Sequence, residues 1–261
     1  MFRSLNIAAT GMTAQETKLD TIANNLANVS TTGYKRQTTE FEDLLYQNVR
    51  IAAPNAQGGA APSGTQVGAG VRVVSTSRTF EQGATLTTNN QLDTAIEGAG
   101  FYSVTRENGD IAYTRAGNLK VDAQGRLVTA DGLPIQPPIT IPNDAVSVTI
   151  AADGTVSALS AASKTPAQLG QIQVTTFANP NGLQALGHNL LTETQASGQP
   201  LTGNPGTDGR GTILQGSLES SNVEMVTEMA DLIRTQRAYE INSKVISAAD
   251  EMLRNATQVG R

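Results

Sequence analysis

Residues 22–37 read IANNLANVSTTGYKRQ, and this stretch carries a helical pattern into a turn and then into an aromatic-basic group. Upstream of Val29, apolar residues recur at alternating spacings of three and four, interrupted at Gln15. They are Leu5, Ala8, Met12, Leu19, Ile22, Leu26 and Val29. This spacing places them on one side of a helix, as in a coiled-coil seam. The pattern predicts an N-terminal helix over residues 1–30, with a turn at Gly33, which tolerates a left-handed backbone.

The other face of this helix is polar but carries few charges. It includes Asn24, Asn25 and Asn28, clustered within about one turn, together with several threonines. A helix face in water normally carries Lys and Glu, because solvated charges cost little free energy. Uncharged amides and hydroxyls suit a buried face on which each polar group is hydrogen-bonded. The composition favours a helix surrounded by protein, although a helix packed only on its own domain remains an alternative.

A second long helix is expected from Val223 to Thr257, with Ser221 or Asn222 as its cap. Apolar residues near heptad spacing form its first stripe: Met225, Met229, Leu232, Tyr239, Ile246 and Leu253. A second stripe consists of Ala238, Ile241, Val245, Ala248 and Met252. Two adjacent stripes make a face that is wider than one partner helix needs. The helix is therefore expected to contact more than one neighbour.

The middle of the chain changes to a period of two residues, which is typical of strands. The expected strands are Val71–Val73, Phe101–Thr105, Ile111–Thr114, Asn118–Val121, Arg126–Thr129, Val146–Ile150, Thr155–Ser157 and Ile172–Phe177. Turn sequences such as Asn108-Gly109 and Asp153-Gly154 separate them. Strands at such short intervals predict an antiparallel β domain, either a sandwich or an open barrel. The fold class is α+β, with two terminal helices in a coiled-coil-like inner domain.

Two stretches rich in Gly and Pro, within residues 52–70 and 198–211, have the composition of linkers or exposed loops. The expected organisation has three parts. Residues 1–30 and 221–261 form the helical inner domain, and residues 71–199 form the outer β domain. Residues 31–70 and 200–220 form an extended region that connects these two domains.

Composition excludes several classes of function. The chain has 261 residues and a net charge of -5, so it has no basic excess with which to bind nucleic acid. It has no cysteines, which excludes disulfides and thiolate metal sites. No apolar run approaches the roughly 18 residues of a membrane span, and no secretory signal is recognisable at Met1.

No catalytic, cofactor-binding or metal-binding constellation is recognisable. The single histidine, His188, lies between turn sequences and has no triad motif beside it. The stretch Asp153-Gly154-Thr155 lacks the alternating ligands of a calcium loop. Charged residues make up 16% of the chain, against roughly 25% in typical soluble domains. A non-enzymatic protein with much of its surface against other subunits is the expectation.

The stretch Ala23–Lys35, ANNLANVSTTGYK, resembles the N-terminal signature of the bacterial flagellar rod and hook proteins. Further blocks follow in the order of that family: FEDLLY at 41–46, GAGFY at 98–102, YTRAG at 113–117, GSLESSNV at 216–223 and QRAYE at 236–240. The resemblance covers the chain from end to end. Its length and blocks are most similar to the members that form the distal rod, which carry an extra insert that corresponds to about residues 46–64 here.

The resemblance implies a structural subunit that polymerises helically into a rigid hollow drive shaft. Such a shaft transmits torque across the periplasm and conducts exported subunits. The implied partners are further copies of the chain, proximal rod and hook-side axial proteins, and surrounding ring or bushing proteins, without nucleic acid or membrane insertion. The implied location is the basal-body rod, after export by the flagellar type III system without a cleaved signal peptide.

The residues expected at subunit interfaces come from both helices. They are Leu5, Met12, Leu19, Ile22, Asn24, Asn25, Leu26, Asn28 and Val29, and Met225, Met229, Leu232, Tyr239, Ile246 and Leu253. Three alternatives stay open: a proximal rod or hook subunit, a periplasmic coiled-coil adaptor, and a secreted hydrolase. An adaptor hairpin would have helices adjacent in sequence, and a hydrolase would need a catalytic motif.

Overall fold

The computed structural model describes residues 2–50, 64–161 and 165–259, which form two compact units. The helical unit comprises Met1–Ala27, Gln37–Ser77 and Glu224–Arg261. The β unit comprises Asn28–Arg36 and Arg78–Val223. The expected α+β class, with two long terminal helices that pack together and a central antiparallel β domain, is confirmed.

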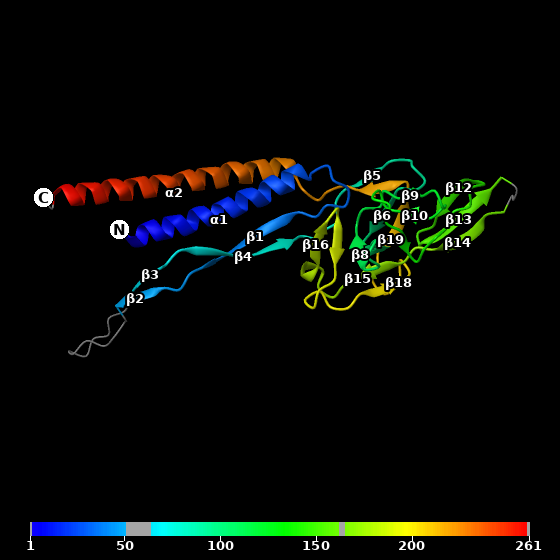
Figure 1. Ribbon diagram of the computed structural model, residues 1–261, viewed down its shortest axis with the longest axis horizontal. Coiled ribbons are helices and arrows are strands. Elements are labelled where there is room, and N and C mark those ends of the chain that lie inside the picture. The colour runs from blue at the N-terminus through cyan, green and yellow to red at the C-terminus, as the bar shows by residue number, and fades with distance from the viewer. Residues whose placement is uncertain (1, 51–63, 162–164, 260–261) are drawn as a thin grey trace. The chain divides into compact units, whose positions relative to one another are not determined.

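The two helices, α1 (Phe2–Ala27) and α2 (Met225–Val259), lie side by side and run antiparallel (Figure 1). Two close approaches define their register. Asn25 Nδ2 donates to Glu228 Oε2 at 3.2 Å, and a Cβ atom on Gly11 would lie 3.0 Å from Asn242 Nδ2. Gly11 and Asn25 are two heptads apart, as are Glu228 and Asn242, so one register accounts for both. A glycine at position 11 lets the two backbones approach closely.

Short strands complete the helical unit. They are β1 (Gln37–Asp43), which pairs with β4 (Val71–Arg78), and β2 (Gln47–Arg50), which pairs with β3 (Thr65–Val67). Strand β1 contacts α1, since the hydroxyls of Thr21 and Thr39 are 2.8 Å apart. Residues 65–67 were expected to be part of a linker or loop. This prediction is wrong, because they form a strand that pairs with β2. Most of the expected insert at 46–64 falls on residues 51–63, which lie outside the described residues.

In the β unit, the largest sheet has the order β16-β17-β8-β7-β15-β18, with β11 also paired to β7. Its strands are β7 (Phe101–Thr105), β8 (Ile111–Thr114), β11 (Ile135–Gln136), β15 (Val174–Thr176), β16 (Gln184–Gly187), β17 (Leu190–Thr192) and β18 (Leu201–Gly203). A second sheet contains β12 (Ala145–Ile150), β13 (Thr155–Ser160) and β14 (Ala167–Gln171). The expected hairpin around Asp153-Gly154 is confirmed, because β12 pairs with β13.

Three further strand pairs and a short 3-10 helix complete the β unit. They are β5 (Thr85–Thr87) with β20 (Ser217–Glu219), β6 (Thr94–Glu97) with β19 (Thr212–Gln215), β9 (Lys120–Val121) with β10 (Leu127–Val128), and the 3-10 helix η1 (Pro180–Gly182). Among the described residues, each strand pair of this unit is antiparallel.

Strand β7 is buried on both faces, because alternate side chains of a strand point to opposite sides. Tyr102 and Val104 belong to the main hydrophobic cluster, together with residues from β13 and β15. Phe101 belongs to a separate aromatic cluster, in which Phe177 packs edge-on against Tyr113 at 4.8 Å between ring centroids. The β unit therefore has its own core, built on either side of one strand.

Candidate assembly surface and its supporting clusters

The interface between α1 and α2 is lined by small and polar side chains. On α2, every seventh residue lies on the side that meets α1: Glu228, Thr235, Asn242 and Ala249. All of these are buried except Asn242, which is half-buried. On α1, Ile22 is the one large apolar side chain that is fully buried within the described residues. Close backbone approach and hydrogen bonds, more than a large apolar core, hold this pair together.

Asn25 forms hydrogen bonds to two other elements at this interface. Its side chain is nearly fully buried, donates to the Gln37 carbonyl at 2.8 Å and accepts from the Gln37 N–H at 2.9 Å. Together with the bond to Glu228, these contacts join α1 to both β1 and α2. An amide can do this because it carries donors and an acceptor on one side chain. Asn25 was expected at a subunit interface, and here it has partners within its own chain.

The threonines of α1 satisfy their hydroxyls locally. Thr13 donates to the Ala9 carbonyl at 2.8 Å, Thr17 to the Thr13 carbonyl at 3.1 Å, and Thr21 to the Thr17 carbonyl at 2.9 Å. These bonds to the preceding turn are a known alternative to a partner outside the helix. The hydroxyls on this face therefore do not require hydrogen bonds from neighbouring subunits.

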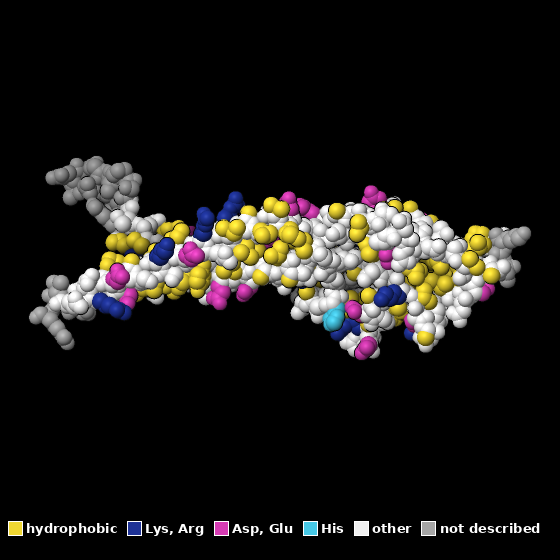
Figure 2. Space-filling view, turned by 90° about the horizontal axis from the view of Figure 1, so that it is seen from above, with side chains coloured by type: hydrophobic (Ala, Val, Ile, Leu, Met, Phe, Trp, Pro, Cys, Tyr) yellow, Lys and Arg dark blue, Asp and Glu magenta, His cyan; other side chains and the backbone are white. Residues whose placement is uncertain are grey.

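The other expected interface residues are only half-buried or are exposed in the single chain. Half-buried positions are Leu5, Met12, Leu19, Leu26, Asn28, Val29, Leu232, Ile246 and Leu253. Exposed positions are Asn24, Met225, Met229 and Tyr239. Further large apolar side chains are exposed on α2, namely Val226, Ile233, Ile241, Val245 and Met252. Figure 2 shows hydrophobic side chains gathered along the helical unit, with Lys and Arg among them. Exposed apolar surface of this extent is typical of interaction sites.

A buried ion cluster supports the β unit. Glu219 accepts from Lys35 Nζ at 2.7 Å through Oε1 and from Arg115 Nε at 2.6 Å through Oε2. The side chains of Lys35, Glu219 and Arg115 are only 4%, 0% and 6% exposed. Burial opposes ionisation of Glu219, but the charge of Arg115 and hydrogen bonds from both cations hold its pKa below the ordinary value. Burial lowers the pKa of Lys35, against the opposing effect of Glu219. The carboxylate therefore stays ionised between two cations.

Backbone groups complete this cluster. Arg115 also donates to the carbonyls of Gly98 and Gly100, both at 2.6 Å, and Lys35 donates to the Glu81 carbonyl at 2.6 Å. Among the described residues, no buried side-chain nitrogen or oxygen lacks a hydrogen-bond partner. Charges removed from water are stable only when paired and hydrogen-bonded in this way. The cluster thus joins the loops before β7 and after β8 to the segment that follows α1.

Gly33 fits against the same cluster for steric reasons. Its φ is +69°, and a Cβ atom would lie 2.8 Å from the Ala116 nitrogen, so a side chain would clash with backbone. Its N–H donates to the Glu219 carbonyl at 2.9 Å. Only glycine meets both demands at low cost. The sequence blocks that contain Gly33, Gly98, Arg115 and Glu219 therefore meet at one place.

The expected helix cap is wrong. Helix α2 begins at Met225, and Asn222 instead accepts from the Arg36 N–H at 2.7 Å and donates to the Thr79 carbonyl at 2.8 Å. Ser221 accepts from the Val223 N–H at 3.3 Å, before the helix begins. Asn222 holds the segment after α1 beside the segment that precedes α2.

The described part of the chain holds no group of three or more His, Cys, Asp or Glu residues that could bind a metal ion. His188 is exposed in a turn, with Nδ1 3.9 Å from Asp131 Oδ2. None of the described helices is both long and apolar enough to cross a membrane.

Three family profiles match the chain. They are "Flagella basal body rod protein" over residues 5–35, "Flagellar hook protein FlgE/F/G D1 domain" over residues 95–158, and "Flagellar basal body rod FlgEFG protein C-terminal" over residues 214–259. The matches therefore include most of α1, the middle of the β unit and α2.

Whole-length relatives give the same result. The chain is 47% identical to the flagellar basal-body rod protein FlgG of Buchnera aphidicola (from Acyrthosiphon pisum), over 99% of this chain and 100% of the relative. It is 47% identical to FlgG of Borreliella burgdorferi over 100% of both chains. It is 46% identical to FlgG of Caulobacter vibrioides over 98% of this chain and 99% of the relative.

Proposed function

The chain belongs to the FlgG family of flagellar basal-body rod proteins, and we propose that it works by helical, head-to-tail polymerisation through its two terminal helices. It is a structural, non-enzymatic subunit of the rod and a component of the flagellar hook–basal body complex. The proposal concerns how the subunit assembles and what the assembly does.

The observation that carries this proposal is the apolar surface left uncovered on the helices. Met225, Val226, Met229, Ile233 and Ile241 are all exposed in the single chain. At about 25 cal/mol per Å² of apolar area removed from water, their burial between subunits would contribute several kcal/mol per subunit. Different surfaces of one chain that bind each other generate an open helical filament when the rotation between successive copies does not close into a ring. The predicted interface residues, from Leu5 to Leu253, are assigned to these contacts.

The filament is a stiff hollow shaft in the distal part of the rod. It transmits torque across the periplasm, and later subunits pass along its channel. The chain itself reaches the rod through the flagellar type III system without a cleaved signal peptide. Its neighbours are proximal rod and hook-side axial proteins along the shaft and ring or bushing proteins around it. The low charged fraction of 16% supports such extensive burial against other protein.

Negative-stain microscopy and sedimentation of the concentrated full-length chain test this proposal. We expect hollow filaments from the intact chain. Deletion of Met1–Val29, or of the residues after Val223, should leave a folded and monomeric β unit that forms none, because the uncovered surfaces lie on the helices. Val226→Asp with Ile233→Asp should also prevent filaments, whereas Val146→Asp, at an exposed β-unit position, serves as the control. Filaments formed by either of these truncated chains would contradict the proposal.

A further inference from the structure

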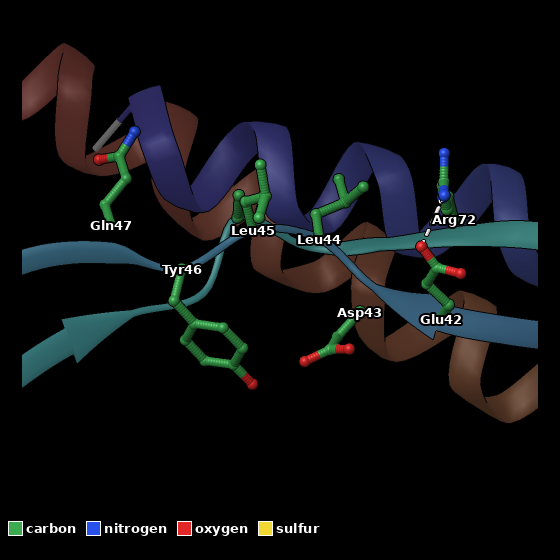
Figure 3. Close-up of a pocket in the computed structure, with 8 residues that line it drawn as sticks. Glu42, Asp43, Leu44, Leu45, Tyr46, Gln47 and Arg72 are labelled. Atoms are coloured by element: carbon green, nitrogen blue, oxygen red, sulfur yellow. Dashed lines mark hydrogen bonds and ion pairs between the residues drawn. The ribbon is translucent and has the colours of Figure 1, made fainter.

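A groove of about 830 Å³ lies in the helical unit, where β1 leads into β2. Its lining includes Glu42, Asp43, Leu45, Tyr46 and Arg72. Leu45 is 91% exposed, and Tyr46 is also exposed. Figure 3 shows Tyr46 and Asp43 extending to the same side of the segment, while Leu45 extends to the other. The groove therefore offers the uncovered ring of Tyr46 on the same side as the Asp43 carboxylate.

Of the two carboxylates in this groove, only Glu42 has an ion-pair partner among the described residues. Glu42 Oε1 accepts from Arg72 Nη2 at 2.6 Å, the ion pair that Figure 3 marks with a dashed line. Asp43 has no cation within ion-pairing distance among the described residues, and its hydrogen bond and charge raise the pKa of Tyr46. One carboxylate thus remains available for a basic partner.

A stripe on α2 has the opposite character. It contains Val226, Ile233, Arg237, Ile241 and Lys244, all of them exposed. At about 100° per residue, Arg237 lies within about 40° of each of the other four around the helix. Ile233 lies about 180° from Asn242, which faces α1, so the stripe points away from the helix pair.

The two cations of this stripe also lack partners in the described chain. Arg234 pairs with Asp231 at 3.3 Å and Arg254 pairs with Asp250 at 2.9 Å, both within α2. Neither Arg237 nor Lys244 has a carboxylate within ion-pairing distance in the part of the chain that the structure describes. The cations that α2 leaves unmatched are those that lie among its exposed apolar residues.

We infer that this stripe of one copy docks in the β1–β2 groove of a second copy, with Arg237 beside Asp43 and Ile241 against Tyr46. The inference rests on the proposed helical assembly and specifies one of its contacts. Apolar contact supplies affinity, and the matched charges fix the register and disfavour other pairings. A second copy is the occupant because both surfaces are uncovered, differ and match in charge, and such a heterologous contact builds an open filament when its rotation does not close into a ring.

Cysteine cross-linking tests the pairing directly, because the natural chain contains no cysteine. A Tyr46→Cys chain is mixed with an Ile241→Cys chain under oxidising conditions, and mass spectrometry identifies the dimer that contains one of each. We expect this mixed dimer to form readily. Ser243→Cys replaces Ile241→Cys as the matched control, because Ser243 is exposed on the same helix but lies about 120° around from Arg237. Equal yields from Ile241→Cys and Ser243→Cys, or no mixed dimer, would overturn the inference.

Charge reversal tests the assigned ion pair. Asp43→Arg in the Tyr46→Cys chain should lower the yield of mixed dimer at least about tenfold, because like charges across an interface are strongly unfavourable. Arg237→Asp in the Ile241→Cys chain should restore it. An unchanged yield with Asp43→Arg, or no restoration, overturns the pairing of Arg237 with Asp43. If the natural chain forms filaments but the two cysteine variants give no mixed dimer, the proposed function stands and this contact is rejected. A mixed dimer without filaments retains the contact and rejects the helical polymer.

Discussion

Asn25 and Glu228 are 203 positions apart in the sequence, yet the side-chain amide of Asn25 donates to the Glu228 carboxylate at 3.2 Å. Asn25→Ala would leave both backbone groups of Gln37 and the Glu228 carboxylate without this partner. Unsatisfied buried polar groups cost about 1–3 kcal/mol, so we expect a loss of about 2–3 kcal/mol in the free energy of unfolding. Urea unfolding of the full-length chain, followed by far-UV circular dichroism, measures it. Asn24→Ala at the exposed neighbouring position should cost less than about 1 kcal/mol, and equal losses would contradict the role of Asn25.

The ion cluster predicts a larger effect in the β unit. Glu219→Gln removes the charge that lies between Lys35 and Arg115 and leaves two buried cations without their counter-ion. Removal of one member of a buried ion pair costs about 3–5 kcal/mol, so the thermal unfolding midpoint should fall by about 6–20 °C. Glu107→Gln, at an exposed turn, is the matched control and should leave the midpoint nearly unchanged. A Glu219→Gln chain as stable as the natural one would show that the cluster does not stabilise the unit.

The same carboxylate predicts a pH dependence. The pKa of Glu219 in the folded chain lies below its ordinary value of 4.5, so the unfolded chain binds the proton first as the pH falls. The stabilisation is therefore fully present above about pH 5 and is lost as the pH falls through the folded pKa. Urea unfolding at steps between about pH 5 and pH 2 should show a steeper loss for the natural chain than for Glu219→Gln. Parallel curves for the two proteins would exclude this contribution.

Hydrogen exchange should separate the two units in a verified monomer. We expect amides of Leu5–Val29 and Met225–Leu253 to exchange much faster than those of the β unit, because the helix interface buries so little large apolar surface. Amides of β7 and β10 should stay protected, since both strands lie in the main core. Local opening of this kind follows low burial and low contact density. Strong protection of both helices in the monomer would show that the pair is stable without neighbours.

Local patterns sufficed for some elements. The expected strands at Phe101–Thr105 and Ile111–Thr114 have the observed bounds of β7 and β8, because β-branched and aromatic residues flank an Asn-Gly turn there. The second helix also lies within two residues of its expected limits. In contrast, β18 lies in a stretch rich in Gly and Pro that reads as a loop. It is a strand because it pairs with β15, which precedes it by some 27 positions. No local pattern encodes such a partner.

The helix interface shows the same limit. Periodicity selects Ile22, which is buried, but also Met12 and Leu19, which are only half-buried. The closest approaches between the helices are at Gly11 and Asn25. The reason is that small and polar residues permit close approach only to a particular partner. Lys35, Arg115 and Glu219 were each part of a recognisable sequence block, but charges so far apart carry no local sign that they meet.

The distance in sequence between Lys35 and Glu219, 184 positions, constrains the order in which the chain can fold. A chain that emerges N-terminus first presents Lys35 early, and its counter-ion follows only after nearly the whole β unit has been made. Contacts between such distant positions form slowly, because a long loop must close before they stabilise anything. A chain that ends before Glu219, for example at a premature stop codon, would leave Lys35 and Arg115 uncompensated. The β unit can therefore complete its fold only after its last strand, β20, has been synthesised. Incomplete chains remain open to proteolysis.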